Sequence, residues 1–289
     1  MPCNKVIILY FAVMRDQKLL DYLQSYLTPR RQELFKKVLS QRTNHFTVAT
    51  EDVYQLHNTS AVIRSCDVFG VQNVHIIEEQ NAKKIDREIA MGAQKWVTIN
   101  RYHTVQDSIK SLKGKGYQIV ATSPHIESYN LGDFDVSKKS ALFFGTERYG
   151  LSDEIMKEAD CTLKIPMYGF TESLNISVSA AIILQSLAER IRKEDVSWQL
   201  NEQEKEDLKF KWLKNNLKNS NELISHFYSK SIFAFELIFV IVIFNVHAFL
   251  RIISFTSCIY IIIWQISLTV VKRFHSSGCC FFMRMIAFS

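Results

Sequence analysis

The sequence lacks the patterns that hold metal ions in proteins. Its six cysteines have no zinc-ligand spacing, and His45, His57, His103 and His125 are not spaced as ligands either. A chain of 289 residues is also too long to need a disulfide scaffold. We therefore expect no metal site and a reducing, cytoplasmic environment.

Two further signatures are missing. No glycine-rich dinucleotide fingerprint follows the first expected strand, 46–49, which disfavours a Rossmann cofactor site. The apolar run 6–14 is short for a signal sequence and has no small-residue cleavage site after it. We interpret residues 1–14 as a dispensable or wrongly assigned start. The formal net charge of +6 favours a polyanionic partner only weakly.

What the sequence does contain, from residue 46 to about 194, is an alternation of strand and helix patterns. Such alternation predicts an α/β domain whose mostly parallel sheet is covered on both faces. We expect strands at 46–49, 74–77, 96–99, 117–122, 141–145 and 162–165. We expect helices at 58–69, 104–113 and 152–158, a long helix that ends near 193, and a short helix or turn at 85–92.

Residues 15–45 read as two short amphipathic helices with a basic polar face. Seven basic side chains there oppose three acidic ones, an excess of four positive charges. Contacts to phosphate groups supply most nonspecific affinity for nucleic acid, so this face is a candidate RNA contact. On charge alone, an ordinary solvated helix face is an equal alternative.

The C-terminal part changes character at about residue 231. Residues 195–230 are polar with a helical pattern, and this helix either packs on the N-terminal helices or is a lightly docked, solvated helix. Beyond it, Ile232–Leu250 and Ile252–Val271 are hydrophobic runs separated by Arg251. Each is about the ~20 residues needed to span a bilayer. A transmembrane hairpin is one interpretation, and we favour the other, a spurious extension of the reading frame.

The most informative segment is Ile165–Ser186, which we call motif 3. After a turn through Gly169, it enters a helix that carries Ser173, Asn175, Ser177 and Ser179 on an otherwise apolar segment. Small residues allow close approach of another backbone, and free donors at a helix start bind polar ligand groups. Alone, the segment could equally be an N-capped amphipathic helix.

Two other segments share this character. Motif 1 is Asn58–Gly70, a helix pattern that ends in glycine. Motif 2 is Phe143–Ser152, a strand that runs into a loop bounded by Gly145 and Gly150. Glycines there permit backbone angles and close approaches that other residues cannot adopt.

In this order and at these separations, the three motifs resemble those of the SpoU/TrmH family of RNA 2′-O-methyltransferases. The resemblance covers about residues 15–225. It implies a SPOUT fold, an α/β domain with a deep C-terminal trefoil knot, flanked here by short N- and C-terminal helices. It also implies a homodimer that uses S-adenosylmethionine to methylate a ribose 2′-OH.

Within that family, the likeness favours action on a guanosine of tRNA, at position 18 of the D-loop. Only about thirty residues precede the first strand in the resembling part of the chain, whereas relatives that act on ribosomal RNA often carry a larger N-terminal domain. An rRNA methyltransferase of the same fold remains an alternative. A catalytically silent RNA-binding or membrane-tethered scaffold is another.

The resemblance also implies roles for individual residues. The expected catalytic residues are Asn58, Arg64, Glu147, Ser173 and Asn175. We expect Asn58 to be an N-cap that also orients Arg64 or meets the ribose. Arg64 either takes the 2′-OH proton or binds phosphate and stabilises charge in the transition state, since a free guanidinium stays protonated.

The remaining expected contacts concern the cofactor and the RNA. The cofactor would be held largely by backbone groups of Thr122, Gly145, Ile165, Met167, Gly169 and Leu174. The RNA would be contacted by Arg30, Arg31, Lys36, Lys37 and Arg42.

Overall fold

The computed structural model describes residues 17–53, 55–78, 89–123, 128–146, 148–229 and 265, without the side chain of Leu56. The chain divides into two compact units, Met1–Asn221 and Glu222–Ser289. Within the second unit, residues 222–229 are helical. The hydrophobic runs at 232–250 and 252–271 lie outside the described residues, apart from Gln265, as do residues 1–14. None of the helices in the described part of the chain has the length and apolarity needed to cross a membrane.

The first unit is built on a sheet of seven strands in the order β3-β2-β1-β6-β4-β7-β5. All of its paired strands are parallel. The strands are β1 (Phe46–Glu51), β2 (Asn73–Ile77), β3 (Thr98–Tyr102), β4 (Gln118–Thr122), β5 (Tyr129–Asn130), β6 (Ser140–Phe144) and β7 (Cys161–Lys164). The predicted α/β architecture is confirmed, while the trefoil knot stays a prediction.

The sheet differs from the sequence expectation by two residues or more at three places. Strand β1 continues to Glu51, two residues beyond its expected end. The third strand begins at Thr98 and not at Trp96, because Ala93–Lys95 forms the 3-10 turn η1 and Trp96 closes it. The short edge strand β5 was not expected at all. It is only two exposed residues long, so it carries no hydrophobic alternation that a sequence pattern could report.

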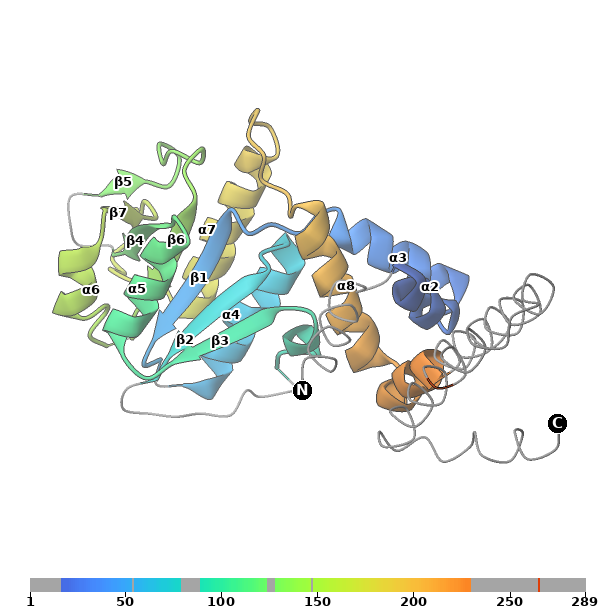
Figure 1. Ribbon diagram of the computed structural model, residues 1–289. Helices are drawn as coiled ribbons and strands as arrows, with labels where there is room; N and C mark the ends of the chain where they lie inside the picture. The colour runs from blue at the N-terminus through green and yellow to red at the C-terminus, as the bar shows by residue number, and fades with distance from the viewer. Residues whose placement is uncertain are drawn as a thin grey trace, which may run out of the picture. The chain divides into compact units, whose positions relative to one another are not determined.

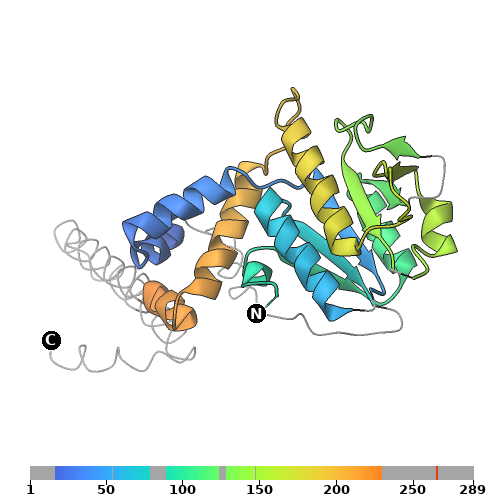
Figure 2. The same cartoon turned by 180° about the vertical axis from the view of Figure 1, so that it is seen from behind.

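Helices cover both faces of the sheet (Figures 1 and 2). Helices α4 (Leu56–Phe69) and α7 (Ile176–Ile191) pack together on one face. Helices α5 (Val105–Gly114) and α6 (Asp153–Glu158) pack on the other. Two hydrophobic cores result because side chains of the strands alternate between faces.

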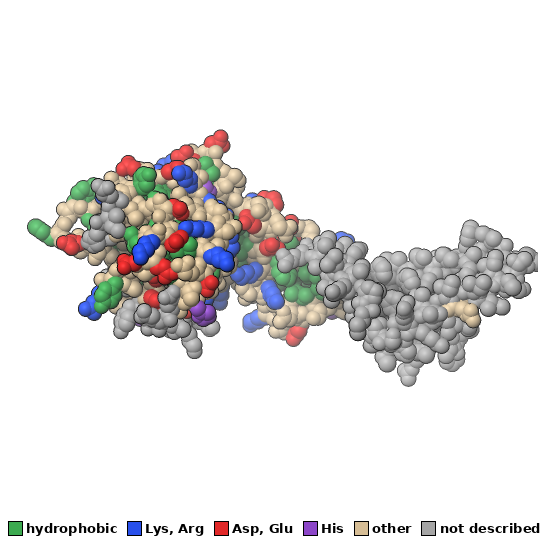
Figure 3. Space-filling model, turned by 60° about the vertical axis from the view of Figure 1, so that its left-hand side comes forward, with side chains coloured by type: hydrophobic (Ala, Val, Ile, Leu, Met, Phe, Trp, Pro, Cys, Tyr) green, Lys and Arg blue, Asp and Glu red, His purple; other side chains and the backbone are tan. Residues whose placement is uncertain are grey.

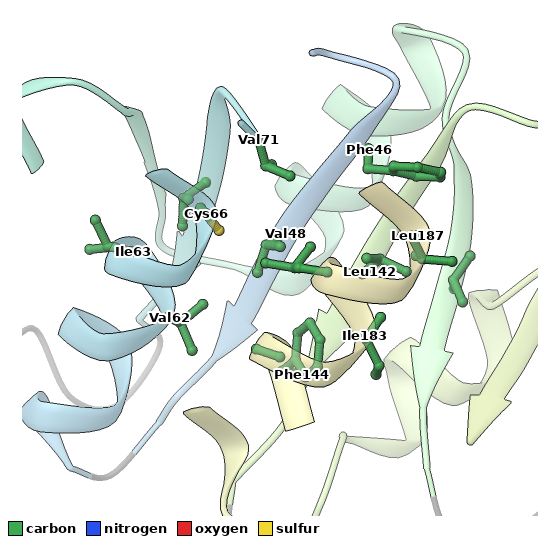
Figure 4. Close-up of a cluster of buried hydrophobic side chains, with 14 of the residues drawn as sticks. Phe46, Val48, Val62, Ile63, Cys66, Val71, Leu142, Phe144, Ile183 and Leu187 are labelled. Carbon is green, nitrogen blue, oxygen red and sulfur yellow. The ribbon is translucent and has the colours of Figure 1, made fainter. Parts of the chain in front are cut away.

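The core under α4 and α7 is the larger of the two. Val48, Leu142 and Phe144 from the central strands meet Val62 of α4 and Ile183 of α7 there (Figure 4). The neighbouring strand residues Ala49, Ala141 and Phe143 point to the opposite core. The central strands are therefore buried on both faces, as is usual for parallel sheets covered by helices on both sides.

The helices before β1 and after α7 form a separate group, the helical appendage, made of α2 (Gln17–Ser25), α3 (Pro29–Leu39) and α8 (Glu202–Asn216). The rings of Phe35, Trp96 and Trp212 pack edge to face in pairs, with centroids 5.5–5.7 Å apart. The indole N–H of Trp212 also donates to the Trp96 carbonyl at 2.9 Å. Helix α8, which covers only part of the expected helical segment 195–230, therefore packs on the N-terminal helices, the first of the two alternatives.

Candidate active site

The predicted cofactor-binding segments meet at one edge of the sheet. Thr122 ends β4, Gly145 follows β6 and Ile165 follows β7, and these three strands are neighbours. Because parallel strands end at the same edge, the three positions lie side by side at their carboxyl ends, where α/β proteins usually bind ligands. We call this region the site edge. Met167, Gly169 and Leu174 follow in the loop between β7 and α7.

The motif 2 loop is closed by its own hydrogen bonds. The backbones of Thr146 and Gly150 exchange two hydrogen bonds of 2.9 and 3.0 Å, and Gly150 has a φ of 70°. A Cβ at Gly145 would lie 2.1 Å from the Gly150 carbonyl and 2.3 Å from the Leu151 nitrogen. Gly145 is therefore required by this close backbone approach, as the sequence indicated. Glu147 lies outside the described residues.

The motif 3 loop differs from the motif 2 loop in its backbone hydrogen bonding. Within the described residues, the backbone N–H groups of 167–174 make no hydrogen bond. Tyr168 is 96% exposed and Phe170 is fully exposed, and hydrophobic side chains also project from the surface drawn in Figure 3. This loop can offer main-chain donors and acceptors to a ligand, which fits the backbone recognition expected for an adenosine cofactor.

Thr122 is consistent with the same mode of recognition. Its hydroxyl donates to the Phe143 carbonyl at 2.7 Å, so the side chain ties β4 to β6. Ile165 packs partly against the larger core. At both positions the side chain stabilises the fold, and the backbone groups are the ones that can contact a ligand.

Motifs 1 and 3 are joined by a hydrogen bond between two asparagines. Asn175 is the N-cap of α7, and its side chain accepts from the Ser177 N–H at 2.8 Å. Its Nδ2 donates to Asn58 Oδ1 at 3.2 Å. The two predicted residues are therefore brought together at the start of α7, while Ser173 lies exposed in the loop before them.

The expectation that Asn58 caps its helix is wrong. The N-cap of α4 is Gln55, and the helix begins at Leu56. Asn58 lies within the first turn, is almost fully buried, and turns its side chain toward α7.

Arg64 lies on the same helix but points to solvent. It is six residues after Asn58, about 240° around the helix, so the two side chains do not share a face. Within the described part of the chain, Arg64 makes no hydrogen bond or ion pair. Asp67, three residues further along the helix, pairs with Arg42 and not with Arg64.

The predicted RNA-binding residues divide into three groups. Arg30, Lys36 and Lys37 are exposed on α3. Arg31 donates to Asn216 Oδ1 at 3.0 Å and lies over the Trp96 ring, so it partly serves the docking of α8.

Arg42 does not fit the RNA-binding role, because it is only 1% exposed. It pairs with Asp67 and lies 5.3 Å from the Trp212 ring. Its partners come from α4 and α8, far away in the sequence, so the local charge pattern could not reveal them.

Sequence reasoning also missed Glu51, the last residue of β1. Its carboxylate is 6% exposed and accepts from the Ser152 N–H, at the end of motif 2, at 2.9 Å. The signal available was an acidic residue at the end of an otherwise uncharged, buried strand. The Cys66 thiol, near Arg64 in sequence, is buried, which raises its pKa well above the usual range and makes it unreactive.

The fold and the site edge define a class, the α/β RNA-modifying methyltransferases. The crystal structure of a TrmH/SpoU tRNA modifying enzyme from Aquifex aeolicus is similar, with a TM-score of 0.59 and 35% identity, over 65% of this chain and 98% of that one. Residues 45–185 match the SpoU rRNA Methylase family.

Similar sequences agree with that class. A tRNA (guanosine(18)-2′-O)-methyltransferase of Borreliella burgdorferi is 41% identical over 202 residues, which is 70% of this chain and 93% of the relative. One from Escherichia coli K12 is 33% identical over 55% of this chain and 69% of the relative. The chain belongs to the SpoU rRNA Methylase family.

Proposed function

We propose that this protein transfers a methyl group from S-adenosylmethionine to the ribose 2′-OH of guanosine 18 in tRNA. The observation that carries the proposal is the convergence of the three motifs at one sheet edge, with Arg64 exposed on the helix that begins there and without a partner among the described residues. Relatives of that activity, 33–41% identical, support the choice of tRNA over ribosomal RNA.

The loops of the site edge are suited to hold the cofactor. Gly145, Ile165 and Leu174 would bind it through main-chain groups, with Thr122, Met167 and Gly169 beside them. When bound, the cofactor supplies a methyl group on a sulfonium that leaves readily toward an aligned oxygen. The contribution of the protein is alignment, since two reactants held in line react as one molecule.

Arg64 is the residue we assign to the RNA. A guanidinium that is exposed and has no partner in the described part of the chain can bind a phosphate next to the reacting ribose through paired N–H donors. It would also stabilise negative charge that develops on the 2′-oxygen. Because a guanidinium in water stays protonated, this role suits Arg64 better than proton removal.

Asn58 and Asn175 would stabilise the relative positions of Arg64 and the cofactor. Their mutual hydrogen bond joins the helix that carries Arg64 to the loop that would hold the cofactor. The bond therefore fixes the distance between the two halves of the site. Ser173 and Glu147 would complete the polar surface around the ribose.

The helical appendage would bind the tRNA backbone through Arg30, Lys36 and Lys37, which are exposed on one helix. A homodimer in the cytoplasm is part of the proposal. Its support is an exposed apolar surface at the start of α7, where Val178 and Ile182 are 45% and 39% exposed and Leu174, in the loop before the helix, is 40% exposed. Val178 and Ile182 are four residues apart in the helix and so lie on one face.

Methyl transfer from labelled S-adenosylmethionine tests the proposal. The substrates are an unmodified tRNA transcript, the same transcript with 2′-deoxyguanosine at position 18, and ribosomal RNA. We expect incorporation into the first alone. Incorporation into ribosomal RNA only would refute the tRNA assignment, and equal labelling of the deoxy transcript would refute position 18.

A further inference from the structure

Glu51 is the residue whose chemistry the proposed function leaves unexplained. It ends the central strand β1, and the pairing of Thr50 with Phe144 places it level with Gly145, where motif 2 begins. Its side chain accepts from the Ser152 N–H at 2.9 Å, where motif 2 ends. One carboxylate thus stands beside both ends of the motif 2 loop.

A buried carboxylate is energetically unfavourable at this position. Burial of a charge costs free energy unless hydrogen bonds compensate for the lost water. No other residue of β1 is charged, so the strand does not need a carboxylate for packing. A charged acceptor does form a stronger hydrogen bond than a neutral one, which suits a residue that must hold a backbone N–H in place.

The motif 2 loop needs such an anchor. Gly145 and Gly150 have no side chains to pack, and the cross-loop bonds of Thr146 and Gly150 close the loop only upon itself. Phe144 fixes its first end through the sheet. Ser152 fixes its second end, because its side chain caps α6 and its N–H is bound by Glu51.

The turn that follows Glu51 leads directly to motif 1. Asp52 adopts a φ of 40°, a left-handed conformation that is unfavourable for a residue with a side chain, and its N–H donates to the Ile77 carbonyl at 3.0 Å. This turn lets the chain leave β1 and enter α4, which carries Arg64. Backbone strain of this kind often occurs at functional sites.

We propose that Glu51 is a positioning residue, which holds the motif 2 loop in register with the helix that carries Arg64. It does not touch the cofactor or the RNA and acts through the Ser152 N–H. The inference rests on the proposed function, because the loop it positions is the one assigned to the cofactor.

Two pairs of variants test the proposal. Glu51→Ala removes the acceptor, and Glu51→Gln keeps a neutral one. Ser152→Pro removes the donor at a position whose φ of −62° proline can adopt. Ser152→Ala is its matched control, since it removes the cap but keeps the N–H.

The first measurement is the affinity for S-adenosylhomocysteine by calorimetry. Loss of a charge-assisted hydrogen bond predicts about a tenfold to hundredfold weaker affinity in Glu51→Ala and in Ser152→Pro. Glu51→Gln should recover part of the loss, and Ser152→Ala should lose less than Ser152→Pro. In the double variant Glu51→Ala/Ser152→Pro the two losses should not multiply, because both single variants remove the hydrogen bond between Glu51 and the Ser152 N–H.

The second measurement is backbone hydrogen exchange of the ligand-free protein. Exchange in residues 145–152 should be faster in Glu51→Ala and unchanged in Thr104→Ala, which removes a helix cap of α5 away from the loop. Unchanged exchange in Glu51→Ala, or losses of affinity that multiply in the double variant, would overturn the proposal. If the unaltered protein fails to bind S-adenosylhomocysteine while exchange responds as expected, the cofactor assignment fails and the positioning role stands.

Discussion

Two arginines show how differently the site edge and the helical appendage use the same side chain. Arg64 lies on α4, exposed and without a partner among the described residues. Arg42 precedes β1 and is buried between α4 and α8, paired with Asp67 and stacked on Trp212. The positive charge of Arg64 is therefore available to a ligand, whereas the charge of Arg42 is neutralised by Asp67 within the fold.

The difference follows from which partner each arginine can reach. Asp67 is three residues from Arg64, the spacing of a helix ion pair, yet Arg42 occupies it from outside the helix. Arg42 therefore links α4 to α8, while Arg64 has no ion-pair partner among the described residues. Substitution of Arg64 should consequently lower the activity, whereas substitution of Arg42 should lower the stability of the fold.

The largest effect is expected for Arg64→Ala. Removal of a cation that stabilises transition-state charge should lower kcat by about a thousandfold, while the melting temperature stays within a degree or so, since no described contact is lost. Initial rates with a tRNA transcript and thermal melts measure both. Arg64→Lys should recover only part of the rate, because lysine cannot bind phosphate in a bidentate manner. A large fall in stability would contradict the comparison.

The next effect is expected for Gly145→Ala. The added Cβ would overlap the backbone of Gly150 and Leu151, so the loop must move, and affinity for S-adenosylhomocysteine should fall by about a hundredfold or more. Gly132→Ala is the matched control, because a Cβ there meets nothing within 4 Å. Equal binding by the two variants would show that the cofactor does not depend on motif 2.

Arg42→Ala should act on the appendage instead. It leaves Asp67 unpaired, and because the Asp67 side chain is 27% exposed, we expect a loss of about 2 kcal/mol in unfolding free energy, below the range for fully buried pairs. Denaturant unfolding measures this loss. A selective loss of tRNA affinity without loss of stability would return Arg42 to the RNA-binding group.

The smallest effect is expected at the bond between motifs 1 and 3. A double-mutant cycle of Asn58→Ala and Asn175→Ala should give a coupling energy of about 1 kcal/mol in unfolding free energy. The cycle removes the separate cost of losing the α7 cap at Asn175. A coupling near zero would mean that the two motifs are held in place by packing alone.

The sheet and its two helical layers could be predicted because their signals are local. Strand and helix patterns that alternate along the chain from residue 46 predict a mostly parallel sheet covered on both faces, which the structure confirms. The residues of the site edge were implied by the family resemblance, and the structure places Thr122, Gly145 and Ile165 at the ends of three neighbouring strands.

What could not be predicted depends on contacts between distant segments. The burial of Arg42 requires Asp67 and Trp212, and the anchoring role of Glu51 requires a backbone N–H about a hundred residues away. The error at Asn58 has a different cause: the helix begins two residues earlier, and a buried asparagine facing α7 has the same local pattern as a cap.

The bare main chain of residues 167–174 bears on how this protein could be inhibited. A compound that hydrogen-bonds to those N–H and C=O groups would keep its contacts through most point mutations, because a substitution changes the side chain and leaves the peptide group in place. Resistance would have to come from proline, which deletes a donor, or from insertions and deletions that reshape the loop.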